Sequence, residues 1–150
     1  MRAVVQRVSE ASVVINGEKV AAISKGLLVL LGIEKSDNEE DGIWLSGKIA
    51  RLRIFPDGYG AMNLPITETE GNIIVVSQFT LHASTRKGNR PSFIRAAKPE
   101  TALPLYKAFI ERLKEDTGKD ISTGEFGAMM QVHLVNDGPV TLFIDSKNKE

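Results

Sequence analysis

Two short segments of the sequence carry groups that could contact a ligand. The first, Ser77 to Leu81, places two hydroxyls and an amide directly after the apolar run Ile73 to Val76. The second, Asn136 to Thr141, contains a Gly-Pro step, where no side chain on the glycine shields the backbone carbonyls from a ligand. Neither segment is decisive alone, because polar residues at a strand end also cap backbone groups.

The local pattern around the Gly-Pro step predicts a β-hairpin. Residues 130–135 partly alternate apolar with polar, residues 140–144 are β-branched or aromatic, and the Asn, Asp and Gly between them suit a turn. The alternative is a cis Gly138–Pro139 bond that serves a site. Cis bonds are a small minority of X-Pro bonds, so this alternative needs support from elsewhere in the chain.

Taken together, these segments resemble the D-aminoacyl-tRNA deacylases. SQFTL at residues 77–81 and NDGPVT at residues 136–141 carry the resemblance, and the start Met1 to Val8 and the run Gly124 to Met130 extend it over essentially the whole chain. The resemblance implies a chiral proofreading enzyme of translation. It would hydrolyse D-aminoacyl-tRNA, and glycyl-tRNA formed on a non-cognate tRNA, to free amino acid and tRNA, and it would spare the L-form.

The resemblance also implies roles for individual residues. The segment after the apolar run would hold the terminal adenosine and the ester, with Ser77 or the backbone N–H groups of Phe79 and Thr80 facing the oxyanion. In a homodimer, Gly138 and Pro139 would reach into the partner's pocket, exclude an L-side chain and accept the substrate's amino group. The implied catalytic residues are Ser77, Gln78, Phe79 and Thr80, and the implied substrate-binding residues are Arg7, Leu81, Phe126, Met130, Gly138, Pro139 and Val140. Arg7 would brace the Gly-Pro turn, and Phe126 and Met130 suit core packing equally well.

The sequence shows no convincing nucleophile with its base. There is no G-x-S-x-G elbow, and no base stands beside Thr80, so the ribose 2′-hydroxyl of the substrate is a candidate to assist the attack of water. His82 is expected to contact phosphate or solvent rather than to act as a general base, and His133 is expected to be exposed. An aminoacyl ester is already activated, so positioning and oxyanion stabilisation matter more than nucleophile strength.

Charge is balanced overall but unevenly distributed. Nineteen basic and nineteen acidic residues cancel, yet no Asp or Glu occurs from Gly71 to Pro99. Three cations of this stretch are expected to contact phosphates of the tRNA acceptor end: Arg86, Lys87 and Arg90. The alternative is a solvated loop.

Several other functions are disfavoured by composition. The chain has no cysteine and only two histidines, so no metal or cofactor is expected. Residues 42–48 match G-x-x-x-x-G-K, but Ile49 stands where a phosphate loop needs Ser or Thr. The apolar run Leu27 to Ile33 is too short to span a bilayer, and a cytoplasmic protein without a membrane partner is expected.

Two other functional classes compete with the esterase. A non-catalytic RNA-binding module would suit the basic loop, but exposed aromatic residues that stack bases are not expected beside it. A small-molecule-binding oligomer would show no dependence on tRNA. Hydrolysis of the ester by pure protein separates both from the enzyme.

The predicted elements form one α+β domain over residues 1–150. Mostly antiparallel sheets are expected to form a barrel-like core with two helices outside. Strands are expected at residues 2–8, 13–16, 19–23, 27–33, 73–81, 129–135 and 140–144. The first helix should follow Ser36 to Glu39, whose ends have capping-box spacing, and the second should run from about Pro99 to Gly118.

Overall fold

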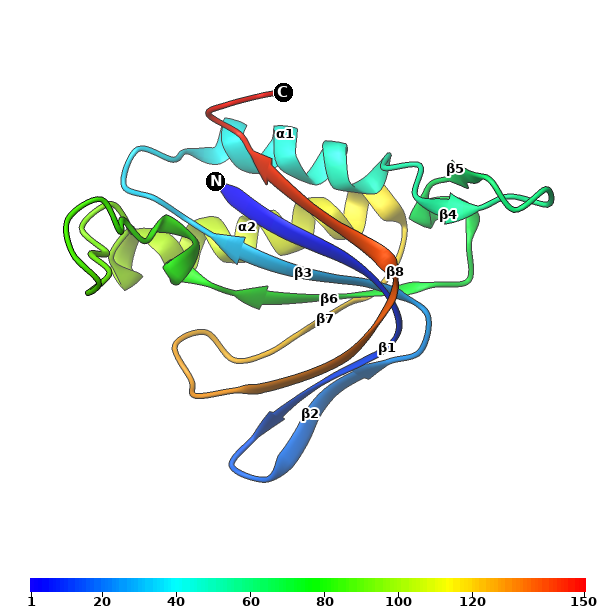
Figure 1. Cartoon of the computed structure of the whole chain (residues 1–150), viewed down its shortest axis with the longest axis horizontal. Coiled ribbons are helices and arrows are strands. Elements are labelled where there is room, and N and C mark those ends of the chain that lie inside the picture. The colour runs from blue at the N-terminus through cyan, green and yellow to red at the C-terminus, as the bar shows by residue number, and fades with distance from the viewer.

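Two helices cover one face of a strongly curved, six-stranded sheet in the computed structural model, which describes residues 1–150 (Figure 1). The strands are β1 (Arg2–Ile15), β2 (Glu18–Ile23), β3 (Gly26–Gly32), β4 (Phe55–Pro56), β5 (Met62–Leu64), β6 (Asn72–Ser77), β7 (Ile121–Thr123) and β8 (Gln131–Asp145). The helices are α1 (Glu39–Ala50) and α2 (Pro99–Thr117), and the 3-10 turns are η1 (Ile66–Glu68) and η2 (Phe79–His82).

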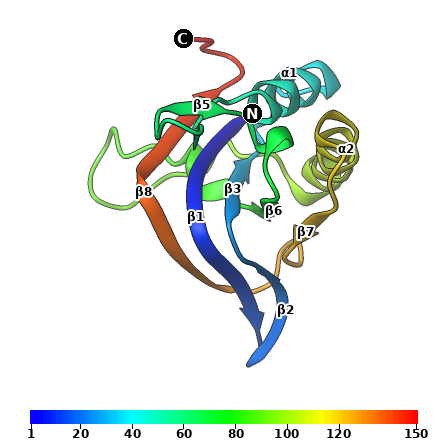
Figure 2. The same ribbon diagram turned by 90° about the vertical axis from the view of Figure 1, so that its right-hand side faces the viewer.

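The main sheet has the order β2-β1-β3-β6-β7, and β8 pairs with β1 as well. Strand β1 is antiparallel to β2, β3 and β8, whereas β3, β6 and β7 are mutually parallel. The sheet curls into a barrel-like shape with both helices on one side (Figure 2). The predicted α+β class is confirmed, and the parallel pairs are an addition that the sequence did not indicate.

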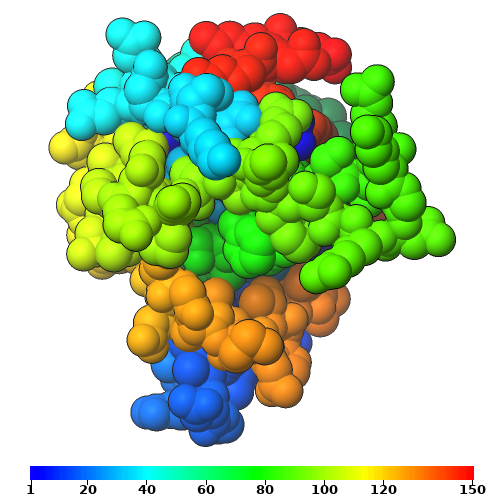
Figure 3. Space-filling view, turned by 90° about the vertical axis from the view of Figure 1, so that its left-hand side faces the viewer, coloured from blue at the N-terminus to red at the C-terminus, as the bar shows by residue number.

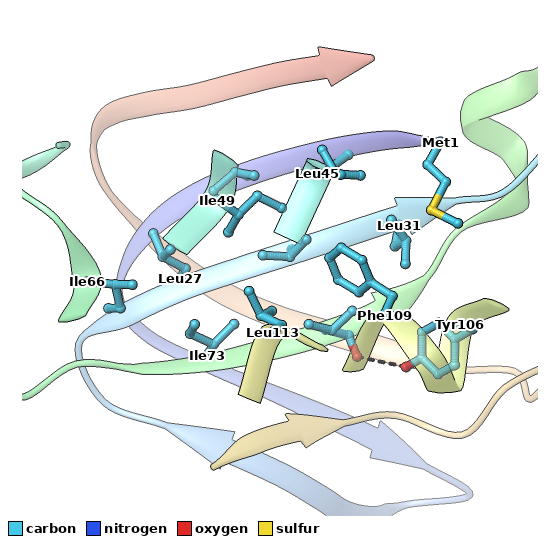
Figure 4. Packing of buried hydrophobic residues seen from close by; sticks show 14 of the residues in the cluster. Met1, Leu27, Leu31, Leu45, Ile49, Ile66, Ile73, Tyr106, Phe109 and Leu113 are labelled. Atoms are coloured by element: carbon cyan, nitrogen blue, oxygen red, sulfur yellow. Dashed lines mark hydrogen bonds between the residues drawn. The ribbon is translucent and has the colours of Figure 1, made fainter. Parts of the chain in front are cut away.

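The curl creates two hydrophobic layers. One face of β3 and β6 packs under α1 and α2, where Leu45 and Ile49 meet Phe109 and Leu113 over Leu27 (Figure 4). The opposite face carries the alternate residues of the same strands, which pack against the far halves of β1, β2 and β8. Because β3 and β6 are buried on both faces, their sequences are continuous apolar runs.

The first third of the chain differs from the separate strands predicted at residues 2–8 and 13–16. Residues 2–15 form one strand, β1, whose first half pairs with β3 and whose second half pairs with β2. The chain does not reverse at Lys25-Gly26, and β2 and β3 follow one another along the same side of β1. Because β1 is long, its first half contributes apolar side chains to the layer under the helices and its second half contributes them to the opposite layer.

The helices lie close to their predicted bounds, but the first cap is different. The capping box of α1 pairs Asn38 with Asp41, not Ser36 with Glu39. The neighbouring Asp37 carboxylate accepts hydrogen bonds from the α-amino group of Met1, at 2.5 Å, and from the backbone N–H of Glu34. Helix α2 ends as predicted, at a left-handed Gly118. Neither helix combines the length and the apolar character needed to cross a bilayer.

The chain ends meet in a buried polar network above the core. The Met1 ammonium donates to Ser146 Oγ at 2.6 Å, and Ser146 Oγ donates to Asp41 at 2.7 Å. Lys147 Nζ completes the network with a 2.8 Å contact to the same carboxylate. These bonds tie the end of β8 to the start of α1.

Candidate active site

The parallel strands β3, β6 and β7 end at the same edge of the sheet, and the first motif lies there. Strand β6 ends at Ser77, and the chain then turns into η2. The predicted strand over residues 73–81 is therefore too long. The Gln78 N–H donates to the Leu31 carbonyl at 2.7 Å, which is the last bond of the β3–β6 ladder before the chain turns.

The η2 turn presents backbone donors beside a threonine hydroxyl. The first N–H groups of such a turn, those of Phe79 and Thr80, have no acceptor within it. The Thr80 hydroxyl is hydrogen-bonded to the Gln78 side-chain amide, and no imidazole or carboxylate bonds to it. The arrangement can therefore stabilise an oxyanion but does not activate Thr80 as a nucleophile.

His82 is buried, contrary to the expected phosphate or solvent contact. Its side chain packs against Gly32 of β3, and neither ring nitrogen has a hydrogen-bond partner. Burial lowers the pKa of His82, and this effect outweighs the nearby Gly32 backbone and the Glu34 carboxylate 3.9 Å away, which favour the charged form. The imidazole is therefore neutral at pH 7 and faces the core side of the turn. His133 is exposed, as predicted.

The second motif does not form the predicted hairpin. Strand β8 runs without reversal from Gln131 to Asp145, and both halves pair with β1. Between the pairs Val8–Asn136 and Gln6–Thr141, four residues of β8 lie opposite Arg7 alone, so the chain bulges outward. The Gly138–Pro139 bond at the bulge is cis. The turn residues therefore suit a bulge within a strand as well as a hairpin.

Arg7 and Asn136 hold the bulge from two sides. The Arg7 guanidinium donates to the Asp137 carbonyl at 2.8 Å and to the Ile54 carbonyl at 2.5 Å. The Asn136 side-chain amide donates to the Arg7 carbonyl at 3.2 Å and to the Val140 carbonyl at 3.0 Å. The sequence suggested the first contact but gave no signal for the second beyond the turn preference of Asn.

The two motifs lie far apart within one chain. Gly138 is level with Arg7, whereas Ser77 is level with Ala3 in the register of β1, β3 and β6. Four residues separate these levels, which is about 13 Å along the strands, and β1 and β3 lie between β8 and β6. The bulge and the η2 turn do not form one pocket in a single chain.

The remaining predicted site residues are divided between the site edge and the core. Leu81 is half-buried, and its carbonyl accepts from Arg2 at 2.9 Å, a contact that the sequence did not signal. Phe126 follows β7 and packs on Tyr106, with ring centroids 5.7 Å apart. Met130 and Val140 pack against the two core layers.

The basic loop projects beside η2. A bridge between Ser84 and Ser92 closes it at its base, with N···O distances of 2.8 and 2.9 Å. Its cations are exposed and form no ion pair: Arg86, Lys87 and Arg90. Against expectation, exposed aromatic rings do lie next to this loop. Phe79 and Phe93 are 55% and 38% exposed.

Comparison with known proteins decides the family. The family model of D-Tyr-tRNA(Tyr) deacylase matches residues 4–145. The chain belongs to the D-aminoacyl-tRNA deacylase family. Relatives named D-aminoacyl-tRNA deacylase from Flavobacterium johnsoniae and Bacteroides fragilis are 59% and 61% identical to this family member over the full length of both chains.

Solved structures share the fold of this family member. A structure described as c-Myc DNA Unwinding Element Binding Protein has a TM-score of 0.92 and 42% identity, and the match covers 97% of this chain and 98% of that one. A probable eukaryotic D-amino acid tRNA deacylase has a TM-score of 0.79 at 17% identity, with 95% and 97% covered. The latter likeness concerns the fold alone.

Proposed function

We propose that this chain is a D-aminoacyl-tRNA deacylase that hydrolyses the ester between a D-amino acid and the ribose of tRNA in the cytoplasm. The family match over residues 4–145 carries the proposal. The chemistry of the site agrees with it, because an activated ester needs oriented donors more than a strong nucleophile. The free N–H groups of Phe79 and Thr80 at η2 are such donors.

The ester would lie over η2 with its developing oxyanion toward these N–H groups, and Ser77 would flank it. No base bonds to Thr80, so the ribose 2′-hydroxyl of the substrate would assist the attack of water. Gln78 would act through Thr80, whose hydroxyl it holds. The terminal adenosine would lie toward Leu81, Phe126 and Met130, at the edge where β6 and β7 end.

A homodimer would complete the site. The bulge at Gly138 and Pro139 is about four residues away from the level of Ser77 within one chain, so it cannot cover η2 of the same chain. In a twofold dimer it would cover η2 of the second copy. Arg7 and Asn136 would keep the bulge in place for this role, and Val140 would anchor its end in the core.

Selection by the bulge would work through exclusion. Backbone carbonyls of Gly138 and Pro139 would occupy the volume that an L-side chain requires and would accept the substrate's amino group. Glycine has no side chain to reject, so glycyl-tRNA would be cleaved as well. A pocket that gripped a D-side chain would instead leave glycine a poor substrate.

The test uses one tRNA charged in turn with a D-amino acid, its L-enantiomer and glycine, and follows release of free amino acid. The proposal expects rapid release of the D-amino acid and of glycine and little release of the L-form. Equal rates for both enantiomers, or no release from any substrate, would show that the chain is not a chiral deacylase. Glycine behaving like the L-form would refute exclusion while leaving the activity standing.

A further inference from the structure

Two exposed aromatic rings lie between the η2 turn and the basic loop. Phe79 belongs to η2, and Phe93 directly follows the Ser84–Ser92 bridge that closes the loop. Their ring centroids are 5.1 Å apart at an interplanar angle of 72°, so the pair is edge to face. The two rings form one contiguous apolar patch rather than scattered exposed residues, and contiguous patches are the kind that mark binding surfaces.

The surroundings of this pair are positively charged. Residues 71–99 contain no Asp or Glu, and none of the ion pairs in the structure includes Arg86, Lys87 or Arg90. By contrast, Arg95 at the end of the segment is held by Glu34 at 2.9 Å. In Figure 3, the loop residues stand out in green from the body of the molecule, where a long polyanion can reach them.

Aromatic rings next to unneutralised cations suit single-stranded nucleic acid. Bases stack on the rings while the cations contact the phosphates. A protein partner of mainly apolar character would leave the cations of the loop without counter-charges. A single-stranded RNA satisfies both parts of the surface at once.

We propose that Phe79 and Phe93 form a stacking surface for the unpaired nucleotides that immediately precede the terminal adenosine of the tRNA. The loop would hold the phosphates of the same strand. The inference rests on the proposed function, because that function places the terminal adenosine at η2. It adds a contact upstream of the scissile ester, made by side chains that take no part in the chemistry.

The experiment separates stacking from packing with two substitutions at one position. Phe93→Tyr keeps an aromatic face, whereas Phe93→Leu keeps apolar bulk without one. Tyr59→Ala, which removes a 99% exposed ring on the distant β4–β5 turn, is the control. Binding of uncharged tRNA is measured with the full 3′ end and with the unpaired nucleotides removed. Hydrolysis of a D-aminoacyl ester of adenosine alone is measured alongside.

Phe93→Leu should weaken binding of the intact tRNA by about 5- to 150-fold, the worth of one stacked base. Phe93→Tyr and Tyr59→Ala should leave it unchanged. The trimmed tRNA should not distinguish the variants, and hydrolysis of the adenosine ester should be the same in all. Uncharged tRNA reports on the surface even if the protein releases no amino acid, so failure of the proposed function is seen separately.

Other outcomes overturn the inference. Equal losses on tRNA and on the adenosine ester would show that Phe93 only supports η2 by packing. A shift of Phe93→Leu to a smaller species in sedimentation would assign the rings to an interface between copies. Absence of tRNA binding by the unmodified protein would also exclude the stacking surface.

Discussion

Replacing Gly138 by alanine tests whether the shape of the β8 bulge controls the reaction. A Cβ at this position would lie 2.0 Å from the backbone nitrogen of Val140 and 2.8 Å from Asn136 Oδ1. Both neighbours are fixed, because Val140 begins the second half of β8 and the Asn136 amide bonds to two carbonyls. The bulge itself must therefore move.

The size of the effect follows from this geometry. Opening the 2.0 Å contact to 3.0 Å requires a shift of about 1 Å at the carbonyls that would face the substrate. A misplacement of this size in a site costs about 100-fold in rate. The crowding should lower the free energy of unfolding by about 1–3 kcal/mol. The rearrangement should stay local, so the protein should remain folded.

The assay compares the rates on D- and L-aminoacyl-tRNA for Gly138→Ala and for Gly58→Ala. Gly58 is the matched control, because its added Cβ meets nothing within 4 Å. We expect Gly138→Ala to lose activity on the D-substrate and to discriminate less between enantiomers, while circular dichroism shows a folded protein. A folded Gly138→Ala protein with normal rate and normal selectivity would refute the role of the bulge.

Three further predictions concern the nucleophile, the loop and the chain ends. Thr80→Ala should retain activity within about tenfold of the unmodified protein, because it removes one hydrogen-bonding hydroxyl. A substrate lacking the ribose 2′-hydroxyl should not react. A folded but inactive Thr80→Ala protein would assign the role of nucleophile to Thr80. Neutralising the loop cations Arg86, Lys87 and Arg90 should weaken binding to a similar extent for different tRNAs. It should also reduce the slope of log affinity against log salt concentration by about one unit per lost contact. Unchanged affinity at low salt would show that the loop is merely solvated. Burial raises the pKa of Asp41, but hydrogen bonds from Lys147, Ser146 and Asn38 outweigh this and bring it to about 2. Because this pKa is below the ordinary 3.8, the resulting stabilisation, on the order of 2 kcal/mol, is present above pH 3.8 and is lost as the pH falls toward 2. Asp41→Asn should have a lower free energy of unfolding at pH 7 than the unmodified protein and should lose less of it on acidification. Urea unfolding at pH 7 and at pH 3 measures both differences. Equal acid sensitivity of the two proteins would contradict the lowered pKa of Asp41.

The sequence could predict the elements whose signals are local. Both helices were placed from their apolar spacing and from Gly118, because a helix closes its hydrogen bonds within a few residues. The apolar runs of β3 and β6 marked buried strands for a different local reason, because a strand covered on both faces is apolar at successive positions. The family resemblance, carried by two short motifs, also lay in the sequence alone.

The partners of each strand and the surroundings of each side chain were decided by the tertiary structure. The turn residues 136–139 allow a reversal or a bulge, and only pairing of both halves of β8 with β1 selects the bulge. His82 follows a motif and precedes a basic loop, yet packing against Gly32 buries it. The separation of Gly138 from Ser77 depends on the register of four strands. These outcomes depend on contacts between residues far apart in the chain, and local sequence preferences do not specify which distant segments will meet.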